Sequence, residues 1–178
     1  EINIDNFEEI KDFSLENKID LIIVGPEKPL VNGIVDYLKD FNIKTFGPNK
    51  IASKLEGSKI FTKNLCKKYK IPTAKFGVFK SLDESIKFLN DCTFPLVVKA
   101  DGLAAGKGVY ICEEKTQARV AIDEIFAGKF GRADKILIEE FLKGEEMSYF
   151  IISDGFTFKK FETAQDHKRV FEGDRGKN

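Results

Sequence analysis

A glycine-rich loop flanked by lysines is the segment of this sequence best suited to chemistry. Residues 97–109 read V-V-K-A-D-G-L-A-A-G-K-G-V, in which an apolar stretch delivers Lys99 and the following loop of small residues carries Lys107. Small residues let backbone N–H groups approach phosphate oxygens, and glycine permits the positive φ that such an anion nest needs. The two ammonium groups would add point charge against a polyphosphate. The pattern favours a phosphate-binding loop, with a mobile hairpin as the alternative.

This loop matches neither of two common nucleotide-binding motifs. A Walker A loop needs glycine five residues before Gly106, where Asp101 stands, and Ser or Thr where Gly108 stands. The G-x-G-x-x-G motif fails at Ile111, which occupies the last glycine position.

A second segment, residues 138–148, concentrates carboxylates at the end of an apolar strand. Glu139 and Glu140 precede a turn at Gly144, and Glu145 and Glu146 follow it. Like charges this dense repel one another unless a cation or ligand hydroxyls relieve them. The segment is therefore either a ligand-binding strand end or an exposed, solvated turn.

A third segment, residues 165–169, reads Q-D-H-K-R and holds the only His of the chain. It suits a carboxylate or phosphate substrate, because Arg binds such groups bidentately. A salt-bridged surface loop is the alternative.

A fourth segment, residues 25–30, reads G-P-E-K-P-L and follows a predicted strand at residues 19–25. Ligands bind at the carboxyl ends of strands in open α/β sheets, and helix N-termini favour anions. A helix from Leu30 to Phe41 and a strand at 43–46 complete a predicted β-α-β unit of a doubly wound sheet. Gly33 inside this helix costs about 1 kcal/mol, which predicts a local packing reason for it.

The remaining elements must position the loop and the acidic strand. A helix at residues 58–69 predicts a domain boundary near Gly57, which divides the chain into 1–57 and 58–178. Ser81 and Glu84 form a capping box that starts a helix, and Asp154-Gly155 indicates a hairpin. The other predicted elements are strands at 76–79, 95–100, 109–112 and 136–142 and a helix around 118–126.

The amino-acid composition argues against some classes of binding partner. The chain has 29 basic and 29 acidic residues, a balance that gives no general attraction to nucleic acid or to an acidic membrane. The three cysteines are dispersed, which argues against a zinc site and favours reduced thiols in a cytoplasmic protein. No apolar run approaches the roughly 18 residues that span a bilayer. The sequence begins without an initiator Met and ends in a polar loop without a closing element. We therefore expect an internal fragment of a longer protein.

The four segments in this order resemble the phosphoribosylamine–glycine ligase family. The resemblance runs from about Ile19 to Arg169 and includes F-G-P-N-K, L-E-G-S-K-I-F-T-K and I-P-T-A besides the segments above. K-A-D-G-L-A-A-G-K-G-V together with Q-D-H-K-R is its most specific part. The resemblance implies a mixed fold of α/β and α+β parts, with a Rossmann-like pre-ATP-grasp portion followed by part of an ATP-grasp domain.

The resemblance also implies a reaction. The family joins glycine to 5-phosphoribosylamine with ATP and Mg²⁺, or Mn²⁺ in its place, through a glycyl phosphate, in purine biosynthesis. Its partners are then small molecules, not nucleic acid or membrane. Because the expected metal ligands lie beyond Asn178, no metal site is expected in this chain, and the 178 residues alone should form no product.

The family pattern implies the following site residues. For ATP these are Lys59, Lys99, Gly102, Ala104, Ala105, Gly106, Lys107, Gly108, Glu139, Glu140, Phe141, Leu142 and Glu146. Within this set, Lys59 and Lys99 would hold phosphates, Glu139, Phe141 and Leu142 the adenine, and Glu146 the ribose, with Glu145 as its competitor. Gly25, Pro26 and Glu27 would face phosphoribosylamine, and Asp166, His167, Lys168 and Arg169 the reacting groups.

Two other functions fit the same segments. A different ATP-grasp carboxylate–amine ligase would keep the ATP residues but use another partner at residues 165–169. A non-catalytic nucleotide-binding module would keep the loop without turnover. A flavodoxin-like receiver in the first 57 residues is disfavoured, because no paired acidic site stands at a strand end.

Overall fold

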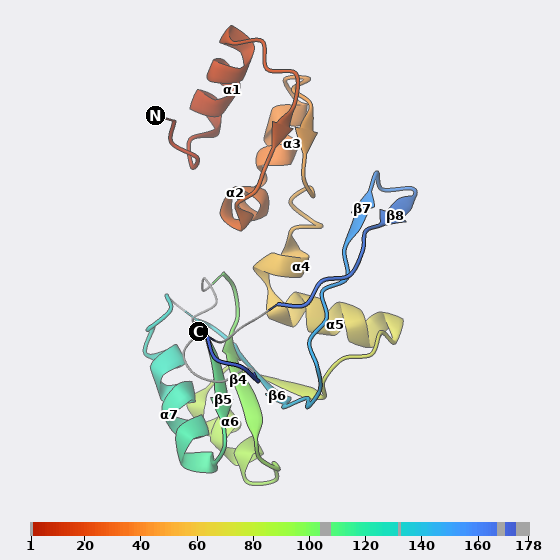
Figure 1. The fold of residues 1–178 in the computed structure, drawn as a ribbon. Helices are drawn as coiled ribbons and strands as arrows, with labels where there is room; N and C mark the ends of the chain where they lie inside the picture. The colour runs from red at the N-terminus through yellow and green to blue at the C-terminus, as the bar shows by residue number, and fades with distance from the viewer. Residues whose placement is uncertain (1, 104–107, 132, 167–169, 174–178) are drawn as a thin grey trace. The chain divides into compact units, whose positions relative to one another are not determined.

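The computed structural model describes residues 2–103, 108–131, 133–166 and 170–173. They fall into two compact units, Glu1–Phe141 and Leu142–Asn178 (Figure 1). Across these residues, no helix has the length and apolar character needed to cross a membrane.

The first unit begins with a small parallel β-α-β arrangement. Strand β1 (Ile22–Ile23) pairs in parallel with β2 (Thr45–Phe46), as the sequence predicts, although both strands are shorter than expected. Helix α1 (Phe7–Glu16), which the sequence reasoning did not predict, precedes them. Ile34, Leu38 and Ile43 form the buried cluster of this part.

The single helix predicted from Leu30 to Phe41 is wrong, because Gly33 divides it. Helices α2 (Glu27–Asn32) and α3 (Ile34–Lys39) meet at this glycine, whose φ of 98° lies in the left-handed region. Its N–H donates to the carbonyl oxygens of Pro29 and Leu30, each at 3.0 Å, and so closes α2. The need for glycine is thus mainly conformational, since a side chain there would be strained.

Two further helices lead to the main sheet. Helix α4 (Lys54–Gly57) ends where Gly57 approaches α2 so closely that an added Cβ would lie 2.9 Å from Val31. Helix α5 (Lys59–Tyr69) begins at once, with Ser58 as its N-cap. The predicted helix at 58–69 is confirmed.

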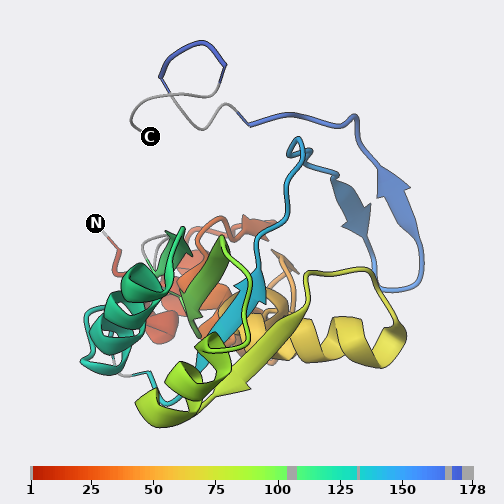
Figure 2. The ribbon, with the colours of Figure 1, turned by 90° about the horizontal axis from the view of Figure 1, so that it is seen from below.

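The main sheet of the first unit has four antiparallel strands, in the order β3-β6-β4-β5 (Figure 2). Its strands occupy the predicted places. They are β3 (Phe76–Phe79), β4 (Leu96–Ala100), β5 (Val109–Cys112) and β6 (Ile136–Glu140).

Helices α6 (Leu82–Leu89) and α7 (Lys115–Phe126) pack against one face of this sheet (Figures 1 and 2). The Ser81 hydroxyl accepts the Glu84 N–H at 3.3 Å, as the capping box predicts. The reciprocal bond differs from the prediction, because the Glu84 carboxylate accepts the N–H of Lys80 rather than that of Ser81.

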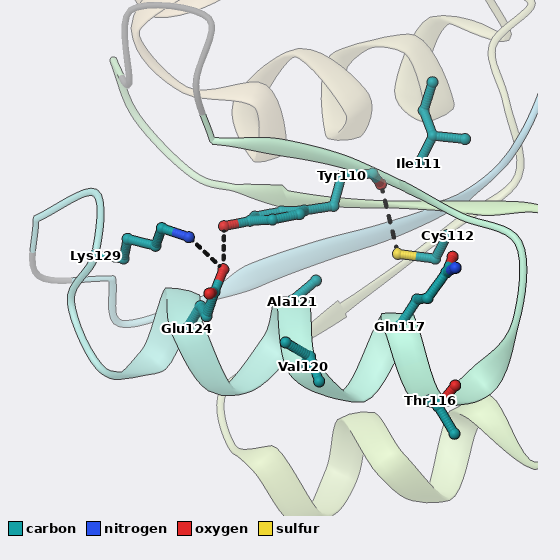
Figure 3. A pocket seen from close by; sticks show the side chains of 9 residues that line it. All are labelled: Tyr110, Ile111, Cys112, Thr116, Gln117, Val120, Ala121, Glu124 and Lys129. Atoms are coloured by element: carbon teal, nitrogen blue, oxygen red, sulfur yellow. Dashed lines mark hydrogen bonds and ion pairs between the residues drawn. The ribbon is translucent and has the colours of Figure 1, made fainter.

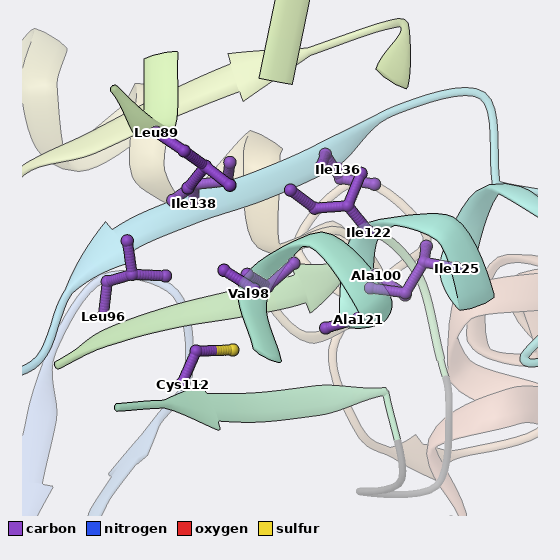
Figure 4. Close-up of a cluster of buried hydrophobic side chains, with 11 residues drawn as sticks. Leu89, Leu96, Val98, Ala100, Cys112, Ala121, Ile122, Ile125, Ile136 and Ile138 are labelled. Atoms are coloured by element: carbon purple, nitrogen blue, oxygen red, sulfur yellow. The ribbon is translucent and has the colours of Figure 1, made fainter. Parts of the chain in front are cut away.

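The hydrophobic core lies between these helices and the sheet (Figure 4). Alternate residues of β4 and β6 point into it, and Leu89 and Ile122 meet them from the helices. Cys112 of β5 is 1% exposed, and burial raises the pKa of its thiol to about 11. Since side chains alternate along a strand, the residues between these core positions point to the opposite face.

The second unit contains one hairpin, β7 (Ile151–Ser153) and β8 (Phe158–Lys160), among its described residues. Asp154 Oδ1 accepts the N–H groups of Phe156 at 2.9 Å and Thr157 at 2.7 Å, which lowers the pKa of this carboxyl group. Gly155 supplies a φ of 91°. The predicted hairpin at Asp154-Gly155 is confirmed.

A candidate nucleotide-binding site

Lys99 and Glu139 meet on the face of the sheet opposite α6 and α7. In the register of β4 and β6, Lys99 lies across from Leu137, and Glu139 lies two residues further along the same face. Their side chains form an ion pair through Glu139 Oε1. Two segments that the sequence assigned to one ligand thus meet in the folded chain.

Lys63 of α5 joins this pair as a third member. Its Nζ lies 2.6 Å from Glu139 Oε2 and donates to Thr73 Oγ1 at 2.7 Å. It also stands 5.7 Å from the ring centroid of Phe76, a cation–π distance. The sequence reasoning gave Lys63 no role, although Lys59 and Lys63 lie one helical turn apart, a spacing that places both on one face.

The carboxylate of Glu139 is almost completely buried, with 6% of its side chain exposed. A buried carboxylate is costly unless it is paired. Among the described side chains, Glu139 Oε2 is a buried oxygen that accepts no hydrogen bond of good geometry. Its contact with the Lys63 ammonium is therefore an ion pair without good hydrogen-bond alignment. The predicted repulsion within the acidic segment is relieved at Glu139 by two lysines.

The start of the glycine-rich loop is fastened to the N-terminus of α5. The carboxylate of Asp101 accepts the Ser58 hydroxyl at 3.0 and 3.1 Å and the Ile60 N–H at 3.2 Å. The Lys59 ammonium donates to the carbonyl oxygen of Gly102 at 2.8 Å. These bonds fix the loop beside Lys59, one of the predicted phosphate ligands.

The Lys59 ammonium is partly buried among charges of both signs. Burial lowers its pKa, the Asp101 carboxylate opposes this shift, the charge of Lys99 adds to it, and Glu56 opposes it. The influence of Lys99 means that the two predicted phosphate ligands are close enough to repel each other. An anion placed near them would relieve that repulsion.

The two ends of the predicted phosphate loop are described, and its middle is not. Gly102 has a φ of 96°, and the N–H of Ala100 donates to the carbonyl oxygen of the buried Gly108 at 2.9 Å. The predicted residues Ala104, Ala105, Gly106 and Lys107 lie outside the described residues.

The other predicted nucleotide contacts divide between the two units. The Glu140 carboxylate accepts the N–H of Lys75 at 2.9 Å and so extends the pairing of β3 with β6. Phe141 is half-buried at the end of the first unit, whereas Leu142 and Glu146 are exposed in the second. A pocket of about 380 Å³ adjoins Glu139 and Glu140 at the end of β6.

The predicted substrate residues are exposed where they are described. Gly25 and Pro26 follow β1, and Glu27 is the first residue of α2, as expected. Pro26, the N-cap, makes no side-chain capping bond. Asp166 is exposed in the second unit, and His167, Lys168 and Arg169 lie outside the described residues.

A separate pocket of about 630 Å³ lies between β5 and α7 and contains none of the predicted site residues (Figure 3). There the Tyr110 hydroxyl and the Lys129 ammonium both donate to the Glu124 carboxylate. Lys129 first, and then Tyr110, hold the pKa of Glu124 below its ordinary value.

Sequence comparison identifies the family. Residues 57–178 match the profile described as phosphoribosylglycinamide synthetase, ATP-grasp (A) domain, and residues 1–56 match the N domain of the same synthetase. The chain belongs to the phosphoribosylglycinamide synthetase family. A phosphoribosylamine–glycine ligase from Mesorhizobium japonicum is 53% identical over 167 residues, which cover 93% of this chain and 39% of the relative. The chain therefore spans about two fifths of that relative's length.

Solved structures agree with this family. The phosphoribosylamine–glycine ligase of Thermotoga maritima matches with a TM-score of 0.71 at 38% identity, over 76% of this chain and 35% of the other. The biotin carboxylase domain of a 2-oxoglutarate carboxylase from Hydrogenobacter thermophilus also has a TM-score of 0.71, at 22% identity over 89% of this chain and 36% of the other. This second likeness shows a shared fold only. The predicted mixed fold with part of an ATP-grasp domain is confirmed for this synthetase family member.

Proposed function

We propose that this chain carries the nucleotide-binding part of an ATP-dependent ligase that joins glycine to 5-phosphoribosylamine. The products would be glycinamide ribonucleotide, ADP and phosphate, as part of purine biosynthesis. The family membership supports the proposal, and the lysine cluster at the root of the glycine-rich loop carries it. The cluster consists of Lys59, Lys63 and Lys99 with Glu139 and Asp101.

The cluster fits the triphosphate of ATP in charge and surroundings. Lys63 and Lys99 share the single carboxylate of Glu139, so one positive charge remains in excess at this pair. On the same sheet face, β5 exposes Val109, which pairs with Lys99, and Ile111, which pairs with Val97. Cations beside an exposed apolar surface suit a nucleotide, whose base is apolar on its faces and whose phosphates are charged.

A divalent metal does not fit the residues described. Within the described ranges, no group of three His, Cys, Asp or Glu side chains could hold a metal ion. Glu139 pairs with two lysines, and Asp101 is bonded to Ser58 and Ile60. We therefore expect Mg²⁺ or Mn²⁺ to be held by residues other than these.

When bound, ATP supplies a γ-phosphoryl group to the glycine carboxylate, and the resulting glycyl phosphate loses phosphate as the amine of phosphoribosylamine forms the C–N bond. Lys59 and Lys99 would neutralise the phosphate oxygens and hold them in place. The loop at residues 104–108 would cover them. No side chain needs to act as a nucleophile, because positioning and charge neutralisation carry phosphoryl transfer.

The remaining assignments are part of the same proposal. Backbone groups at Glu139, Phe141 and Leu142 would meet the adenine, and Glu146 the ribose. Residues 25–27 would contact phosphoribosylamine, and residues 166–169 the reacting groups. We retain the domain division into 1–57 and 58–178 and a cytoplasmic location as predictions.

The test is ADP release by the complete gene product with each substrate omitted in turn. We expect release that depends on both glycine and phosphoribosylamine, with one glycinamide ribonucleotide formed per ADP. ADP release that follows another carboxylate instead of glycine would indicate a different ATP-grasp ligase. ATP binding without ADP release under any of these conditions would indicate a non-catalytic module.

A further inference from the structure

We propose that Lys63 is a positioning residue for nucleotide recognition, which acts through Glu139 on Lys99. Lys63 would set both where the Lys99 ammonium stands and how much of its charge remains for a phosphate. The inference rests on the proposed function, because it requires Lys99 to meet the phosphates of ATP.

The geometry gives each oxygen of Glu139 its own cation. Glu139 lies on the inner strand β6, paired with Phe76 of β3 on one side and with Val97 of β4 on the other. Lys63 approaches over Phe76 and contacts Oε2 at 2.6 Å. Lys99 approaches from β4 and contacts Oε1. The carboxylate therefore links the two ammonium groups without direct contact between them.

The exposure of the three side chains gives them an order from inside to outside. Glu139 is 6% exposed, Lys63 13% and Lys99 25%. Lys63 is also tied to Thr73 Oγ1, a bond that helps to hold its ammonium beside the carboxylate. A ligand that arrives from solvent would therefore meet Lys99, and Lys63 would act on it only through Glu139.

Lys63 changes the net charge close to the Lys99 ammonium. With Lys63 in place, two cations share one anion, so the cluster retains a positive charge near Lys99. Without Lys63, Glu139 and Lys99 become a neutral pair in a poorly solvated site. Lys99 would be held by the carboxylate and would attract phosphate less strongly, since charges interact more strongly where water is excluded.

The experiment replaces Lys63 in the complete gene product and measures affinity for ATP and for adenosine, together with kcat and the KM for ATP. Lys63→Met removes the charge with little change in length, and Lys63→Arg keeps it. Lys67→Met is the matched control, because Lys67 is exposed one turn further along α5. We expect Lys63→Met to weaken ATP binding and raise the KM about tenfold, with little change in kcat or in adenosine affinity.

The variants Lys63→Arg and Lys67→Met should remain within about threefold of the parent protein. Should Lys63→Met fail to fold, Lys63→Gln replaces it, because the amide can still donate to Glu139 and Thr73 while carrying no charge. The inference is overturned if the uncharged variant binds ATP as well as the parent does, or if it loses adenosine affinity to the same extent as ATP affinity.

Lys99→Met separates this result from a failure of the proposed function. If Lys99→Met weakens ATP binding and the uncharged Lys63 variant does not, the proposed function stands and the inference fails. If neither variant affects ATP binding, the proposed function itself fails.

Discussion

Two helix N-termini carry predicted ligand-binding residues, Lys59 at α5 and Glu27 at α2, and they differ in what satisfies their N–H groups. At α5, the Ser58 hydroxyl accepts the Phe61 N–H at 3.1 Å, and the Asp101 carboxylate accepts that of Ile60. At α2, no side chain caps the helix, and Pro26 and Glu27 are exposed. The chain's own carboxylate thus occupies the place where an anion would bind at α5.

The difference teaches that the two segments would recognise a ligand by different means. At α5, the N-terminal N–H groups bind the chain's own side chains, so in the proposed site phosphate recognition would fall to the ammonium groups of Lys59 and Lys99. At the turn before α2, Gly25 and Pro26 offer mainly backbone. Removal of a charge should therefore matter most at the first segment.

The largest effect is expected from Lys99→Met in the complete gene product. Loss of a charge-assisted hydrogen bond to phosphate should weaken ATP binding about 100-fold, or about 3 kcal/mol. Lys28→Met is the comparison variant at the other segment, where the Lys28 ammonium pairs with Asp5. Titration calorimetry should show an unchanged ATP affinity in Lys28→Met. Equal losses of affinity in both variants would show that ATP binding depends no more on Lys99 than on a lysine near the turn before α2.

The next effect concerns stability. Asp101→Ala removes the acceptor for the Ser58 hydroxyl and the Ile60 N–H, and should lower the free energy of unfolding by about 2 kcal/mol. Asp83→Ala, in the exposed first turn of α6, is the control and should cost less than about 1 kcal/mol. Urea unfolding measures both, and a similar cost in both variants would show that Asp101 is no more than a favourable charge at a helix end.

A smaller effect is expected at the turn before α2. Glu27→Ala should raise the KM for phosphoribosylamine about fivefold, or about 1 kcal/mol, because one side-chain hydrogen bond is lost and the backbone contacts remain. Initial rates at saturating ATP measure this, and the KM for ATP should not change. If the KM for ATP rose and that for phosphoribosylamine did not, the proposal that residues 25–27 contact phosphoribosylamine would be wrong.

The smallest effect is a change in titration. Because burial lowers the pKa of Lys59 below the ordinary value of 10.5, the folded protein bears a cost for the charged ammonium at every pH below the folded pKa. As the pH rises from the folded pKa of Lys59 towards 10.5, the folded protein loses this proton before the unfolded chain does. The contribution of Lys59 to the free energy of unfolding therefore becomes more favourable over that pH range. The ¹³Cε shift of Lys59 should titrate below that of the unfolded chain, and a saturating nucleotide should raise its midpoint.

Much of the main sheet could be predicted from the sequence, because its strands carry apolar runs bounded by turn residues. Phe76–Phe79 and Val109–Cys112 have the predicted bounds. Lys99 and Glu139 were assigned to one ligand by resemblance alone. Their contact depends on the register of β4 and β6, which no local pattern reveals.

The missed features depend on contacts between distant residues or on backbone conformation. The contact of Lys63 with Glu139 spans two elements, and the bond of Ser58 to Asp101 joins residues 43 positions apart. Helical periodicity continues across Gly33, so the pattern of apolar residues conceals the left-handed φ that divides α2 from α3.

Cys112 gives the protein a built-in reporter of local opening. Its thiol is 1% exposed on the edge strand β5 and has a pKa of about 11, so an alkylating reagent at neutral pH reaches it only when the strand detaches from the core. With the less buried Cys66 and Cys92 replaced, the rate of its labelling would time excursions of the strand that carries Val109 and Ile111.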